Sequence, residues 1–309
     1  MTFFTNDFAL KALAGLFFDI NNIASAKEKT SAEYTGYKEV ILSEEEMVEF
    51  YSAPATNHFD LCTNEYLIIY NSEGEIVDRI VWTGEKYRQL RFHNFNSKYF
   101  GDVKPMKDDV YQMLAADSVV NNQITMLCGK PGSGKTYIAF GYLFSLLDHG
   151  KIDRIIIFCN PTTAKNAAKL GFYPGSATEK LMSSQVGAVL SSKIGSALEV
   201  ERLIQQEKLI LMPAADARGY ETPARSGVYI MESQNLTSDL LRMLLQRIKE
   251  DCKVIVDGDY NEQVDMDVYQ ESNGMREMSR VFRGEDIYGQ VELQNIHRSA
   301  IAKIADKMR

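Results

Sequence analysis

The feature that most constrains this chain is a glycine-rich run at residues 129–136, Gly-Lys-Pro-Gly-Ser-Gly-Lys-Thr, which matches the pattern G-x-x-x-x-G-K-[ST] at every position. It follows the apolar, strand-like run Ile124–Cys128 directly and precedes a helix-like stretch that reaches Leu147. A glycine-rich turn between a buried strand and a helix N-terminus lets backbone N–H groups surround a phosphate. The run alone also fits a turn that binds nothing, but the flanking strand and helix favour a phosphate-binding loop.

Two side chains of this loop have a definite expected chemistry. Lys135 is expected to reach the β and γ phosphates of ATP, and the Thr136 hydroxyl is expected to bind Mg²⁺. The expected ATP-binding residues of the loop are Gly129, Lys130, Pro131, Gly132, Ser133, Gly134, Lys135 and Thr136. The loop does not say what the energy is used for, because kinases, GTPases and motors share it.

Composition predicts an ordinary globular protein. With 45% hydrophobic and 25% charged residues in 309, the chain is long enough for two domains. The formal charge of −8 argues against a surface that coats a polyanion, although a local basic groove can coexist with an acidic whole. No C-x-x-C pair occurs, so we expect reduced core thiols at Cys62, Cys128, Cys159 and Cys252.

The sequence predicts neither a signal peptide nor a membrane helix. No stretch approaches the roughly eighteen uninterrupted apolar residues of a membrane helix, and residues 1–19 contain Asp7 and Asp19 without a small-residue cleavage site. We therefore expect a soluble, cytoplasmic protein that does not engage a membrane.

The sequence changes in texture near residues 100–107, where Gly101 and Pro105 interrupt a polar stretch. We place a small α+β N-terminal domain at residues 1–103 and a larger domain at residues 104–309.

Within the first domain, Ser43-Glu44-Glu45-Glu46 has the form of a capping box and predicts the start of a helix. The β-prone runs 66–70 and 76–82 flank a turn-rich segment and predict a hairpin.

In the second domain, short β-branched runs alternate with helical stretches, which predicts an α/β fold with a parallel sheet covered on both faces. The expected strands are 124–128, 154–159, 209–212, 228–231 and 253–256, and the expected helices include 136–147 and the amphipathic stretch 237–250, with Thr237 as its cap.

Two further strand ends carry polar residues. Val228–Asn235 is a buried strand that ends in a carboxylate and an amide, and Lys253–Asp265 is a strand followed by Gly-Asp and a polar loop. The first segment alone would fit a strand that leaves the core into a polar turn. Beside a phosphate loop, however, a carboxylate can polarise water and an amide can sense the γ-phosphate.

Five ordered segments together resemble the PhoH family of P-loop ATPases, relatives of superfamily 1 helicases. The family order is a phosphate loop, L-G-F-x-P-G, D-E-A-Q-N, G-D-x-x-Q-x-D and a late arginine. Here these read as residues 129–136, Leu170–Gly175, Met231–Asn235, Gly258–Asp265 and Arg298. The resemblance covers nearly everything after Pro105 and implies a RecA-like P-loop domain that binds and hydrolyses ATP.

The resemblance also implies roles for single residues. Lys135 would act in catalysis, Glu232 would be the catalytic carboxylate and a metal contact beside Thr136, and Arg298 would neutralise charge in the transition state. Gln234 and Asp259 would sense the γ-phosphate. Gln112 falls where such ATPases place a glutamine that reads adenine, although a solvated helix position fits it nearly as well.

The chain departs from the family pattern at two positions. Met231 stands where the family has the aspartate that holds the metal through water, so turnover could be slow. Asn160 replaces an arginine before Pro161, which removes a cation from the surface.

Several uses of the nucleotide remain open at this point. The resemblance implies an ATP-driven remodeller of single-stranded RNA or DNA. Met231 and the acidic surface favour instead a nucleotide-dependent switch that acts on a protein partner with little hydrolysis. A small-molecule kinase ranks third, and the scattered aspartates of the N-terminal region do not favour a nuclease.

Interleaved cations and aromatic residues at Lys86–Phe100 fit a nucleic-acid platform, and they fit a half-buried strand somewhat better. Because one RecA-like unit lacks the second domain of a monomeric helicase, a ring-like homo-oligomer is expected, with Arg298 acting within its own site or across an interface.

Overall fold

The computed structural model of the chain describes residues 2–4, 19–21, 33–159, 185–259 and 273–297. Its contacts divide the chain into two units, Met1–Tyr34 and Thr35–Arg309. In the first unit, β1 (Thr2–Phe4) pairs in parallel with β2 (Asp19–Asn21). All candidate site residues belong to the second unit.

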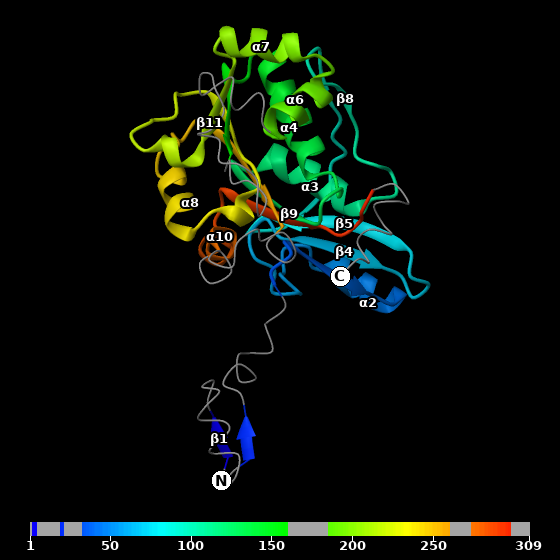
Figure 1. Cartoon of the computed structure of the whole chain (residues 1–309). Helices are drawn as coiled ribbons and strands as arrows, with labels where there is room; N and C mark the ends of the chain where they lie inside the picture. Colours follow the sequence, from blue (N-terminus) through cyan, green and yellow to red (C-terminus); the bar gives the residue numbers. More distant parts are fainter. Residues whose placement is uncertain (1, 5–18, 22–32, 160–184, 260–272, 298–309) are drawn as a thin grey trace. The chain divides into compact units, whose positions relative to one another are not determined.

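A six-stranded parallel sheet forms the centre of the second unit (Figure 1). Its strand order is β11-β10-β12-β13-β9-β14, and every neighbouring pair is parallel. The order places β9, the strand before the glycine-rich loop, inside the sheet. The expected RecA-like α/β architecture is therefore confirmed. The strands are β9 (Ile124–Gly129), β10 (Arg154–Cys159), β11 (Leu209–Pro213), β12 (Ser226–Ile230), β13 (Lys253–Gly258) and β14 (Tyr288–Leu293).

Both faces of the sheet carry buried side chains, because successive side chains of a strand point to opposite sides. Met126 and Ile156 belong to one buried cluster, whereas their neighbours Leu127 and Ile157 belong to another. Figure 1 shows α3, α4 and α6 on one face and α8 and α10 on the other. The helices are α3 (Val110–Asn121), α4 (Lys135–Asp148), α6 (Gln185–Ile194), α7 (Ala197–Gln205), α8 (Ser238–Leu245) and α10 (Gly274–Phe282).

Helix α8 begins as predicted but ends early. Thr237 caps it by accepting a hydrogen bond from the backbone of Leu240. The helix was expected to reach residue 250 and ends at Leu245. Ile248 packs against the buried cluster that also contains the buried residues of α8. The chain therefore turns after the helix and returns to β13.

The part of the second unit that precedes α3 is built on a four-stranded sheet. Strand β3 runs parallel to β4, and the β4–β5 and β5–β6 pairs are antiparallel, with β4–β5 the predicted hairpin. Helix α2 (Glu44–Ser52) begins with the predicted capping box, in which the Ser43 and Glu46 side chains each bond the other's backbone. The strands are β3 (Tyr37–Ile41), β4 (Tyr66–Tyr70), β5 (Ile76–Trp82) and β6 (Tyr87–Gln89).

The segment expected to separate two domains is folded onto α4. Strands β7 (Phe95–Ser97) and β8 (Gly101–Val103) form a hairpin, and Val103 is fully buried. Tyr66 and Ile68 of β4 share one hydrophobic cluster with Leu114 of α3. Residues on both sides of the expected boundary at 103/104 thus share a core, and that boundary stays a prediction.

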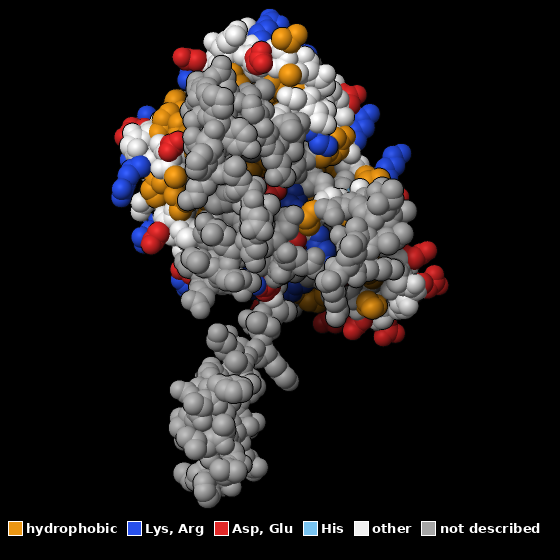
Figure 2. All heavy atoms as spheres, viewed as in Figure 1, with side chains coloured by type: hydrophobic (Ala, Val, Ile, Leu, Met, Phe, Trp, Pro, Cys, Tyr) orange, Lys and Arg blue, Asp and Glu red, His pale blue; other side chains and the backbone are white. Residues whose placement is uncertain are grey.

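The surface formed by the described residues carries both acidic and basic side chains. In Figure 2, acidic side chains gather over α2, whose first turn contains Glu44, Glu45 and Glu46, while lysines and arginines are spread over the visible face. No helix within the described ranges is long and apolar enough to span a bilayer.

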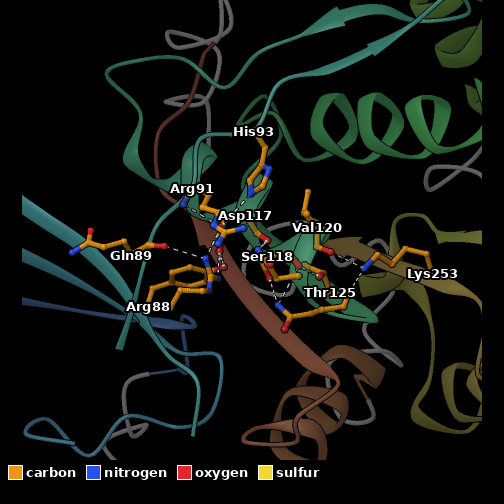
Figure 3. A network of polar contacts seen from close by, with 12 residues as sticks. Arg88, Gln89, Arg91, His93, Asp117, Ser118, Val120, Thr125 and Lys253 are labelled. Atoms are coloured by element: carbon orange, nitrogen blue, oxygen red, sulfur yellow. Dashed lines mark hydrogen bonds and ion pairs between the residues drawn. The ribbon is translucent and has the colours of Figure 1, made fainter. Parts of the chain in front are cut away.

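A buried ion pair joins the four-stranded sheet to α3 (Figure 3). Asp117 is fully buried and receives two hydrogen bonds from the Arg88 guanidinium, at 2.6 and 3.1 Å. His93 Nε2 lies 3.2 Å from the same carboxylate, and the Tyr66 hydroxyl donates to it at 2.9 Å. Burial alone would raise the pKa of Asp117, but the hydrogen bonds from His93 and Arg88 outweigh it and lower the pKa from 3.8 to about 2.

We expect Asp117→Asn to lower the free energy of unfolding at neutral pH by about 3 kcal/mol, because Arg88 keeps its charge without the carboxylate. Since the folded-state pKa is depressed, the stabilisation is present above the ordinary pKa of 3.8 and is lost as the pH falls towards 2. Urea unfolding of both proteins at several pH values measures this. The exposed Asp239, paired with Arg242 on α8, provides the control Asp239→Asn, which should leave stability nearly unchanged. A difference between wild type and Asp117→Asn that persists undiminished in acid would contradict the assignment.

Candidate phosphate-binding site

The glycine-rich loop adopts a shape that only glycine accepts easily. Gly129, Gly132 and Gly134 have φ values of +133°, +87° and +104°. Helix α4 begins immediately after Gly134, so the first backbone N–H groups of the helix adjoin the loop. Ser133 is fully buried, and its hydroxyl has no hydrogen-bond partner within the described residues.

Lys135 is held inside this loop. Its ammonium donates hydrogen bonds to the backbone carbonyls of Gly129 and Lys130, the latter at 3.1 Å. The side chain is nearly buried, which places a positive charge beside the loop backbone.

Gln112 supports the loop from α3. The side chain is buried, its Oε1 accepts from the Met106 backbone at 3.0 Å, and its Nε2 donates to the Ser133 carbonyl at 3.1 Å. A Cβ added at Gly134 would lie 2.7 Å from that Nε2. Gln112 is therefore a buried contact of the loop and not a solvated helix position; its reading of adenine stays a prediction.

The end of β12 brings three of the expected residues together. The Gln234 side chain donates to Glu232 Oε2 at 2.5 Å, and its Oε1 accepts from the Asp259 backbone at 3.2 Å. Glu232 has a positive φ of 52°, an uncommon conformation for a side chain other than glycine. Glu232, Gln234 and Asp259 thus meet at one strand edge, as parallel pairing of β12 with β13 requires.

Asp257 is a functional candidate that the sequence analysis missed. It is buried at the end of β13, where its Oδ1 accepts from the Glu232 backbone at 3.0 Å and its Oδ2 accepts from the Tyr229 hydroxyl at 2.7 Å. Burial, followed by the charge of Glu232, raises the pKa of Asp257 to about 6, and Lys135 opposes this shift. The available signal was a carboxylate directly before Gly258-Asp259 at the end of an otherwise apolar strand.

The residues present fit a magnesium-bound nucleoside triphosphate. The left-handed glycines suit phosphate oxygens, as does the Ser133 hydroxyl, for which the described part of the chain offers no hydrogen-bond partner, and Lys135 supplies positive charge. Burial raises the pKa of the Tyr229 hydroxyl and the nearby Thr136 side chain opposes this rise, so the expected metal-binding hydroxyl lies close to the hydroxyl that donates to Asp257.

Some expected residues lie outside the described ranges. They are Asn160, the 170–175 segment, residues 260–265 and Arg298. His297, directly before Arg298, is described: its backbone donates to the Gly132 carbonyl at 2.9 Å, and its Nε2 lies 2.5 Å from Asp109, the N-cap of α3. The described chain therefore reaches the loop one residue before Arg298.

The candidate nucleic-acid segment at residues 86–100 is used largely for packing. Arg88 and His93 bind Asp117, and Phe100 stacks against Phe144 of α4. Phe92 differs, with 72% of its surface exposed. It lines a pocket together with Arg79, His93, Asn94, Lys104, Pro105, Lys107 and Met113.

A sequence model of the PhoH-like protein family matches residues 103–308. The chain belongs to the PhoH-like family. Membership in this family of P-loop ATPases implies nucleotide binding.

Individual relatives match different shares of this chain. Protein PhoH2 of Bacillus subtilis is 25% identical over 88% of this chain and 63% of its own length. Protein PhoH of Escherichia coli is 32% identical over 46% of this chain and 40% of its own length. The PhoH-like chain therefore spans less than two thirds of these relatives. Among solved structures, one described as an ATPase domain aligns at 17% identity with a TM-score of 0.26, over 52% of this chain and 67% of that one.

We expect Gly134→Ala to lower the affinity for ATP at least about tenfold, because a Cβ there strains the left-handed backbone and displaces Gln112 from the loop. Calorimetric titration with MgATP measures the affinity. The control is Gly150→Ala, which has a similar backbone strain at φ +65° but open space around the Cβ. Equal affinities in the two variants would show that the loop shape does not govern binding.

Proposed function

We propose that this PhoH-like protein binds MgATP at the loop, hydrolyses it and couples the hydrolysis to the remodelling of single-stranded nucleic acid, RNA in particular. The observation that carries the proposal is the meeting of Lys135, Glu232 and Gln234 with the left-handed glycine loop at one edge of a parallel sheet.

The proposed chemistry assigns a task to each group. Loop N–H groups and Lys135 hold the phosphates, and Glu232 orients and deprotonates the attacking water. The Gln234 amide, bonded to Glu232 and to the Asp259 backbone, connects the water side of the site to the strand end of β13. The Thr136 hydroxyl would hold Mg²⁺ together with the phosphates, and the ion would supply neutralising charge. Arg298 has the proposed task of neutralising charge in the transition state.

A second candidate function is a nucleotide-dependent switch with little hydrolysis, acting on a protein partner. The observation in its favour is Met231, which is 5% exposed at the end of β12 and places a thioether where the family has a carboxylate. The two candidates differ in turnover, because a switch needs binding without steady phosphate release.

Steady phosphate release distinguishes them. We expect wild type to release phosphate from ATP, Lys135→Ala to lose both binding and release, and Glu232→Gln to bind ATP while releasing phosphate about a hundredfold more slowly. Glu201→Gln, on the exposed surface of α7, is the matched control. Tight binding by wild type without release would favour the switch, and equal release by wild type and Glu232→Gln would exclude the assigned role of Glu232.

The nucleic-acid part of the proposal is based on the pocket around Phe92. The exposed ring can stack on a base, and Lys104 and Lys107 are exposed cations on the same pocket. The buried Arg79 Nε has no hydrogen-bond partner within the described residues. One aromatic face beside several cations suits a single strand, whose unstacked bases and phosphates need both.

We expect single-stranded RNA to stimulate phosphate release by wild type, and Phe92→Ala combined with Lys107→Ala to lower that stimulation about tenfold with basal release unchanged. The control pair Leu198→Ala and Lys151→Ala removes an exposed apolar side chain and a cation elsewhere. Phosphate release is measured against the concentrations of single-stranded RNA, single-stranded DNA and duplex. Absence of stimulation by every polymer would refute coupling to nucleic acid.

Assembly belongs to the same proposal. One RecA-like unit offers a single strand-edge site, and helicase-type sites are completed by a second domain. We propose that a second copy of the chain completes it, in a ring-like homo-oligomer.

A further inference from the structure

The family has an acidic residue at the end of β12, where this chain has Met231. We propose that the carboxylate of Asp257, on β13, performs the task of that residue and holds the hydration shell of Mg²⁺ beside Thr136. This inference rests on the proposed function, because it concerns the metal that accompanies ATP.

The register of the sheet places the two positions side by side. Ile230 of β12 pairs with Val256 of β13, and one step further along the two strands lie Met231 and Asp257. Tyr229 and Ile255, a registered pair two residues earlier, both belong to the buried cluster on the α4 face. Because side chains alternate along a strand, Met231 and Asp257 point to that same face, where α4 begins.

Tyr229 separates Asp257 from the expected metal ligand, Thr136, and contacts the carboxylate directly. The Tyr229 hydroxyl donates to Asp257 Oδ2 at 2.7 Å, and the Thr136 side chain lies close enough to the same hydroxyl to oppose the rise in its pKa. Tyr229 thus lies between Thr136, in the first turn of α4, and Asp257, on β13. A carboxylate behind a metal-binding hydroxyl or water orients it and strengthens the site, which is the usual task of groups around the first shell of ligands.

The other oxygen of Asp257 fixes the catalytic carboxylate. Its Oδ1 accepts from the Glu232 backbone at 3.0 Å, at the residue whose φ is +52°. The two side chains therefore have different tasks. Asp257 acts on the metal side of the site and bonds the backbone of Glu232, while the Glu232 carboxylate accepts from Gln234. Asp257 is accordingly a positioning residue.

The test compares ATP affinity in buffer with magnesium and in buffer with EDTA, by calorimetry on the full chain. Wild type should bind ATP more tightly with magnesium. Asp257→Asn should lose about tenfold of that magnesium-dependent affinity while its affinity in EDTA stays near wild type, because the loop and Lys135 are unchanged. Adding Met231→Asp to Asp257→Asn should restore the magnesium dependence, since a carboxylate returns to the neighbouring strand.

Controls separate the metal role from a structural one. Asp251→Asn, an exposed aspartate before β13, should behave as wild type. If Asp257→Asn does not fold, Tyr229→Phe carries the test: the ring volume is kept, the hydroxyl between Asp257 and Thr136 is removed, and a loss of magnesium dependence is expected. Thermal unfolding of each variant reports its folding.

Each outcome is decisive. Absence of ATP binding by folded wild type in both buffers overturns the proposed function itself. If wild type binds ATP, an unchanged magnesium dependence in Asp257→Asn or Tyr229→Phe overturns this inference and leaves the proposed function standing. An equal loss in both buffers, without restoration by Met231→Asp, shows that Asp257 only stabilises the fold and also overturns it.

Discussion

The parallel pairing of β13 between β9 and β12 is the constraint on which the rest of the site depends. Asp257 pairs with Leu127 of β9, and Val256 pairs with Ile230 of β12. All three strands run the same way, so their carboxyl ends reach one edge together. The glycine loop, Glu232 and Asp259 follow those ends directly, and three segments far apart in sequence become one site.

Helix α3 transmits the position of the N-terminal sheet to this edge. Its middle carries Asp117, which holds Arg88 of β6, and its N-cap Asp109 contacts His297. Gln112, one turn into the helix, bonds the Ser133 carbonyl of the loop. The four-stranded sheet is therefore connected to the phosphate-binding loop through one rigid element and a short series of buried polar contacts.

The charged groups of the site act on one another. Lys135, Asp257 and Glu232 lie close enough to shift the pKa of Asp257, with the carboxylate of Glu232 and the ammonium of Lys135 acting in opposite directions. An apolar residue at 231 avoids adding a further carboxylate beside Glu232, Asp257 and Asp259, which would raise the cost of ionisation further. The position of the acid on β13 is thus consistent with the electrostatics of its surroundings.

Local chemistry determined much of this protein from sequence alone. The loop pattern, the capping box at Ser43, the hairpin of β4 and β5 and the alternation of strands and helices depend on neighbouring residues, so they could be predicted. The meeting of Glu232, Gln234 and Asp259 followed from the order of motifs that the chain shares with the PhoH-like family. Tertiary structure alone decided what depends on partners distant in sequence. It set Asp257 beside Met231, Arg88 and His93 against Asp117, and Gln112 beneath the loop, because strand register and helix packing bring together residues whose spacing along the chain contains no record of that contact.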